Sequence, residues 1–149
     1  MALLEADHVA EIRQAFDEHL EADVKLSLVG PNAENPPSRD YTKDIRELLS
    51  ELVAISPKLS MEYVDAPSDE QRKSLGMSAD EGGPITVISG AARGKVRFVG
   101  VPAGHEFPSL VKAIIDVSRG MSEALTAASR AMLQHIERPV HIRVFFTPT

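Results

Sequence analysis

Apolar and polar positions follow two periods along the chain, and these periods predict helices and strands in turn. Over residues 6–20 the apolar side chains are three or four positions apart, which indicates a helix with one buried face. From Val24 every second residue up to Leu28 is apolar, which is typical of a strand over residues 24–29. The chain therefore opens with a helix and a strand.

The following residues predict three more strands and several helices. Prolines and asparagines over residues 30–40 indicate a loop, after which Asp40 or Thr42 can cap a helix that Pro57 ends. The later predicted elements are a strand at 59–64, a short helix near 69–75, a strand at 85–88, its hairpin partner at 95–99 and a helix at 105–119. A strand–helix–strand crossover, a hairpin and a covering helix give an α/β fold, a mixed four-stranded sheet flanked by helices.

The last segment repeats the pattern of the first. Residues 122–136 predict another helix, with Ser122 as its cap, and residues 140–146 predict another strand. Each apolar position of the opening helix and strand has an apolar counterpart 116 positions later, as Phe16 has in Met132. We interpret residues 1–120 as one complete unit and residues 121–149 as the helix and first strand of an incomplete second unit.

Composition and charge argue against several classes of function. The 149 residues carry a formal net charge of -6 and no run of Lys or Arg, which argues against a nucleic-acid partner. No apolar stretch approaches the roughly 20 residues that span a bilayer. Acidic residues stand where a signal peptide has basic ones, so we expect a cytoplasmic protein without membrane contact. The chain has no cysteine, which excludes disulfides, thiolate zinc sites and iron–sulfur clusters.

Two segments resemble a known family. Residues 97–107 (RFVGVPAGHEF) and 115–119 (IDVSR) resemble the junction between the two thioredoxin units of protein disulfide oxidoreductases, also called glutaredoxin-like proteins. The Gly-His-Glu-Phe part is also similar to the N-terminal domain of the alkyl hydroperoxide reductase flavoprotein subunit. Supporting similarity to both lies at residues 47–52 and 58–60, and residues 144–149 resemble the strand that leads into the Cys-Pro-Tyr-Cys site of the oxidoreductases.

The resemblance implies a thioredoxin-like fold of the glutaredoxin type that lacks the redox site. Gly83 and Pro84 occupy the position of that fold's cis-proline, where redox members pair with substrate peptide, so we expect a vestigial peptide groove there. In relatives with an N-terminal CxxC, this motif lies where the present chain has residues 31–40, which contain no sulfur. A second CxxC would begin immediately after Thr149.

Other polar residues give only weak signals for chemistry. Ser38 has no histidine nearby in the sequence to activate it, so we predict no nucleophilic role. Glu106 is expected to complement a helix dipole. Histidines beside carboxylates lack a third metal ligand, as at His8, His19 and His105. We therefore predict no catalytic residue, no metal site and no cofactor.

These features leave three hypotheses for function. We favour a redox-inactive thioredoxin-fold unit that acts as a binding or scaffold module. The alternative is a truncated part of an active protein disulfide oxidoreductase in cell redox homeostasis, with its CxxC after Thr149. An unrelated enzyme would require a cleft that collects His105, His141 and carboxylates with shifted pKa values.

The predicted closing strand needs partners for its backbone N–H and C=O groups. It can pair with the edge of the first unit's sheet or with its twin in a second copy of the chain. We expect a protein partner or self-association through this strand, as a homodimer.

Overall fold

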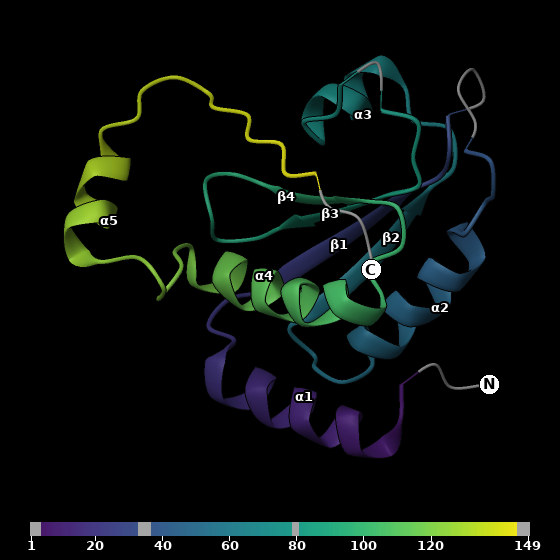
Figure 1. The fold of residues 1–149 in the computed structure, drawn as a ribbon, viewed down its shortest axis with the longest axis horizontal. Helices are drawn as coiled ribbons and strands as arrows, with labels where there is room; N and C mark the ends of the chain where they lie inside the picture. Colours follow the sequence, from purple (N-terminus) through teal and green to yellow (C-terminus); the bar gives the residue numbers. More distant parts are fainter. Residues whose placement is uncertain (1–3, 33–36, 79–80, 146–149) are drawn as a thin grey trace.

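A computed structural model shows that the chain folds around a four-stranded mixed sheet (Figure 1). The structure describes residues 4–32, 37–78 and 81–145. The strands are β1 (Val24–Val29), β2 (Leu59–Val64), β3 (Ile85–Ser89) and β4 (Val96–Val99), in the spatial order β2-β1-β3-β4. β1 is parallel to β2 and antiparallel to β3, and β4 is antiparallel to β3. This arrangement confirms the predicted crossover and hairpin.

The helices also form where the apolar periodicity predicts them. They are α1 (Ala6–His19), α2 (Thr42–Val53), α3 (Asp69–Ser74), the 3₁₀ turn η1 (Gly104–Glu106), α4 (Phe107–Arg119) and α5 (Ala127–Gln134). The predicted cap of α2 at Asp40 or Thr42 is wrong, because Tyr41 is in the N-cap position and makes no side-chain cap. Asp40, one residue before it, accepts a hydrogen bond of 2.8 Å from the Thr42 N–H. Pro108 lies in the first turn of α4, where a missing N–H costs no helical hydrogen bond.

The main core lies between one face of the sheet and the helices α1, α2 and α4. Val24, Leu26 and Leu28 of β1 all point to this face and are almost completely buried. Phe16 of α1 packs into the same cluster with 1% of its surface exposed. Figure 1 shows α4 lying across this face, with α2 beside it and α1 below. No helix in the described part of the chain is long and apolar enough to cross a membrane.

Ser74 and Glu81 contact side chains on the other face of the sheet. Arg97 of β4 is opposite Val87 of β3, so its side chain leaves the sheet on the side away from the main core. There the Arg97 guanidinium forms an ion pair with Glu81, and Lys95 donates to the C=O of Ser74. The segment that leads into β3 is therefore held to β4 by side chains.

The IDVSR segment at the end of α4 fastens the loop between α1 and β1. The buried Ser118 hydroxyl accepts hydrogen bonds from the N–H groups of Glu21 (2.8 Å) and Ala22 (2.9 Å) and donates to the C=O of Ala22 (2.7 Å). Arg119 donates from Nε to the C=O of His19 at 3.0 Å. The residues that carry the family resemblance here thus have a structural role.

The C-terminal part departs from the prediction. The helix is shorter than predicted, because its cap is Thr126, whose hydroxyl accepts from the Ser129 N–H at 3.1 Å, and not Ser122. The predicted strand at 140–146 is wrong for residues 140–145, which form no strand, while residue 146 lies outside the described residues. No strand of the described sheet pairs with this segment. The alternation of apolar and polar residues is therefore not enough to form a β-ladder without a neighbouring strand.

The apolar residues of this segment are consequently exposed. Val140, Ile142 and Val144 have 65%, 80% and 78% of their surface accessible, whereas their counterparts in β1 are buried. Met132 of α5 is 74% exposed, in contrast to Phe16 of α1. The two ends of the chain therefore share a pattern but differ completely in burial.

Candidate functional site

The predicted site residues lie where β1 ends and β3 begins. The Gly83-Pro84 peptide bond is cis, as the resemblance implies, and Pro84 is buried immediately before β3. The Gly30 N–H donates to the C=O of Val64 at 2.9 Å, which brings the end of β2 to the same place. The candidate site is thus built from the carboxyl ends of β1 and β2 and the amino end of β3.

Backbone hydrogen bonds join the loops around this site. The N–H of Asn32 donates to the C=O of Gly82 at 2.7 Å, and the N–H of Gly100 donates to the C=O of Pro84 at 2.9 Å. Within the described part of the chain, the N–H and C=O of Gly83 have no hydrogen-bond partner. The backbone of Gly83 can therefore pair with an extended peptide, while its neighbours hold the loop in place.

Gly83 also packs closely on the loop after β1. Its φ of 70° lies in the left-handed region, and a Cβ at this position would lie 3.0 Å from the Gly30 oxygen and 3.2 Å from the Pro31 Cα. Both neighbours are backbone atoms, so they cannot move aside as a flexible side chain would. The absence of a side chain at Gly83 allows the two loops to meet.

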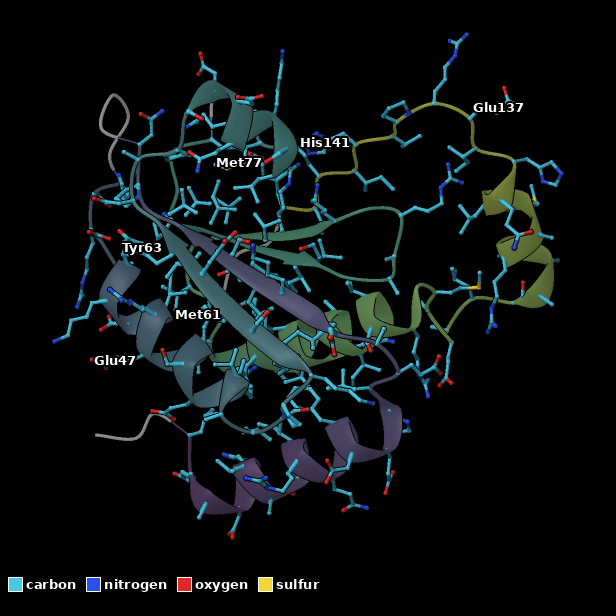
Figure 2. All side chains as sticks on the ribbon, turned by 180° about the vertical axis from the view of Figure 1, so that it is seen from behind. Glu47, Met61, Tyr63, Met77, Glu137 and His141 are labelled. Atoms are coloured by element: carbon cyan, nitrogen blue, oxygen red, sulfur yellow. The ribbon has the colours of Figure 1, made fainter. Side chains whose placement is uncertain are left out.

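Tyr63 and Asp65 lie next to Gly30 at the edge of the site, and Arg46 lies over the Tyr63 ring. The hydroxyl of Tyr63, which is labelled in Figure 2, donates to Asp65 at 2.9 Å. The Arg46 guanidinium lies 5.2 Å from the centre of the Tyr63 ring. Burial, followed by the hydrogen bond to Asp65, raises the pKa of Tyr63 above its usual range. Tyr63 therefore remains a protonated hydrogen-bond donor at neutral pH and positions the end of β2.

The segment that replaces the N-terminal CxxC carries polar contacts of another kind. Residues 33–36 lie outside the described residues. After them, Ser38 is exposed, and the Asp40 carboxylate accepts a hydrogen bond from the Thr42 N–H at the start of α2. Hydrogen bonds from the hydroxyl and the N–H of Thr42 lower the pKa of Asp40, which stays ionised. These contacts stabilise the start of a helix and supply no activated nucleophile.

The histidines singled out in the sequence do not meet at this site. His105 is exposed in η1, and His19 accepts from Arg119 through its backbone C=O. His141 contacts Arg97 of β4. Among residues 4–32, 37–78 and 81–145, no group of three His, Cys, Asp or Glu side chains is arranged to hold a metal. A shallow hollow in the described surface is lined by α1 alone, away from Gly83.

Comparison with known proteins identifies relatives among the alkyl hydroperoxide reductases. No family model matches the chain. The alkyl hydroperoxide reductase component AhpF of Staphylococcus aureus (strain MRSA252) is 30% identical over 112 residues, which are 75% of this chain and 19% of that protein. The corresponding protein of Xanthomonas campestris pv. phaseoli is 32% identical over 106 residues, 71% of this chain and 18% of that protein.

Solved structures show the same fold. The NTD_N/C domain of alkylhydroperoxide reductase AhpF from Enterococcus faecalis has a TM-score of 0.64 and 22% identity, covering 84% of this chain and 57% of that chain. A protein disulfide oxidoreductase from Aeropyrum pernix has a TM-score of 0.66 and 21% identity, covering 89% and 55%.

These comparisons confirm the thioredoxin-like fold and both resemblances predicted from the sequence. The chain spans about a fifth of the length of its curated relatives and just over half of the solved chains.

Proposed function

We propose that this chain is a redox-inactive thioredoxin-fold unit that acts as a binding or scaffold module beside thiol–disulfide redox proteins. The observation that carries this proposal is the complete absence of cysteine from a fold shared with a disulfide oxidoreductase. Electron transfer between dithiols requires an attacking thiolate, and no other side chain replaces it. What remains of the site is a backbone surface at Gly83 and Pro84, where an extended segment of a partner protein would bind.

An insulin reduction assay tests the redox part of the proposal. With dithiothreitol as electron donor, residues 1–149 are expected to precipitate insulin no faster than a protein-free blank, because no thiolate is available. A thioredoxin with an intact CxxC serves as the positive control in the same buffer. Turbidity that rises reproducibly faster with this chain than in the blank would overturn the proposal.

A second candidate function is that the unit forms part of a longer, active protein disulfide oxidoreductase. The observation in its favour is that the chain spans just over half of the solved oxidoreductase that it resembles. In that case the reading frame would continue past Thr149 into a CxxC, and the longer product would reduce insulin. Sequencing the transcript beyond the Thr149 codon separates the two functions, and the predicted cytoplasmic location fits either.

We also propose that the chain self-associates through its C-terminal segment. Large apolar side chains are exposed there on α5 and on the residues that follow it: Met132, Leu133, Ile136, Val140, Ile142, Val144 and Phe145. A concentration of exposed apolar side chains in one segment is typical of protein contact sites. Residues 140–145 keep the alternating pattern of a strand without a ladder partner in the described sheet, so pairing with the twin segment in a symmetric homodimer would supply one.

Sedimentation of a matched pair of variants tests self-association. We expect the unmodified chain to sediment as a dimer and Ile142→Asp as a monomer, because a carboxylate cannot be buried in an apolar contact without a partner. Ala10→Asp adds the same charge on the exposed face of α1 and should remain a dimer. A concentration-independent monomer for the unmodified chain would exclude the proposed contact.

A further inference from the structure

Polar side chains of the segment after α5 contact the body of the protein. We refer to residues 138–145 as the C-terminal arm. A ring nitrogen of His141 accepts a hydrogen bond from Arg97 of β4, and Arg143 Nη2 donates to the Ser78 hydroxyl at 3.0 Å. Figure 2 shows His141 where the arm reaches the side of α3 and β4. His141 and Arg143 thus contact the body of the molecule, while the apolar side chains of the arm are exposed.

Both contacts end on groups that hold the same turn. Arg97 forms an ion pair with Glu81 at 3.5 Å, and the two side chains are only 13% and 10% exposed. Glu81 accepts from the Ser78 N–H at 3.0 Å and donates through its own N–H to the Ser78 C=O at 3.3 Å. Ser78 and Glu81 are therefore linked to each other and, through Arg97 and Arg143, to the arm.

This turn leads directly into the candidate site. Gly82 follows Glu81 and accepts the hydrogen bond from the Asn32 N–H, and Gly83 packs against Gly30. Only Gly82 separates Glu81 from Gly83 in the chain. The path from the arm to the site consists of direct contacts and contains no unconnected step.

From these contacts we infer that the C-terminal arm regulates the candidate groove. When the arm is seated, His141 and Arg143 hold Arg97 and Ser78 in place, and the groove at Gly83 is ordered. When the arm is drawn away to pair with its twin in a second copy of the chain, the contacts of Ser78 and Glu81 loosen and the groove opens locally. The inference extends the proposed function by assigning regulation to the same site.

The size of the expected effect follows from the few polar contacts that the arm makes with the body of the protein. The contact between Arg97 and His141 lies at the surface, so it contributes modestly to stability. The Arg143 contact is exposed as well. The arm can therefore bias the turn without being essential for folding of the core.

Amide hydrogen exchange measured by NMR in the background of the monomeric Ile142→Asp variant tests this coupling without any partner. In the double variant His141→Ala with Arg143→Ala, we expect the amides of Glu81 and Asn32 to exchange about fivefold faster, the effect of losing roughly one net hydrogen bond. The amide of Ala92, bonded to the C=O of Val117, reports on the core and should not change.

Arg138→Ala provides the matched control. Arg138 is an exposed cation on the same arm with no hydrogen bond or ion pair to any described residue, and its loss should leave all three amides as they are. Unchanged exchange at Glu81 and Asn32 in the double variant would refute the coupling, as would an equal increase at Ala92. Because this readout needs neither redox activity nor a partner, it is independent of the insulin assay.

Discussion

Phe16→Ala is expected to lower the free energy of unfolding by about 3–5 kcal/mol, the usual cost of removing a buried aromatic ring. Phe16 is 1% exposed and packs with the core residues of β1, α2 and α4, so truncation leaves a cavity that the surrounding rigid elements cannot fill. Urea denaturation followed by circular dichroism measures the loss as a shift of the midpoint at constant m-value.

Met132→Ala is the control for that experiment, since Met132 stands 116 positions later in the repeated pattern. Because Met132 is 74% exposed, its truncation in dilute solution is expected to change stability by less than about 0.5 kcal/mol. Similar losses for both variants would contradict the finding that only the first copy of the pattern is packed.

Ser118→Ala is expected to lower the free energy of unfolding by about 2–4 kcal/mol, although it removes a single oxygen atom. The hydroxyl makes three hydrogen bonds of 2.7–2.9 Å to the backbone of Glu21 and Ala22, and alanine leaves all three groups without that partner. The loss should appear in urea denaturation, with faster exchange of the Glu21 and Ala22 amides.

Ser109→Ala on the exposed side of α4 is the matched control and should be neutral within about 0.5 kcal/mol. It keeps the chemical change and the helix the same but removes no buried contact. If Ser118→Ala were equally neutral, the IDVSR segment would not fasten the loop between α1 and β1.

The site at Gly83 and Pro84 could be placed from the sequence only through the resemblance. Nothing in the local pattern of residues 82–84 distinguishes a turn from a binding groove, since glycine and proline are common in both. Which residues surround this site is decided by the tertiary structure. Gly30 and Asn32 come from the loop after β1 and Tyr63 comes from β2, and both are far from Gly83 in the chain. The sequence did not indicate that Arg97 contacts Glu81 and His141, because polar contacts between residues distant in the chain produce no periodic sequence pattern.

The sequence by itself determined the elements of the first unit and excluded thiol chemistry. Helices and strands there follow from side chains a few positions apart, which is local information, and the absence of cysteine is a property of composition. Only the tertiary structure decided whether the repeated apolar pattern at the C-terminus forms a strand. A strand is stable when neighbouring strands accept its hydrogen bonds and a helix covers its apolar face; β1 has both, and the described residues 140–145 have neither.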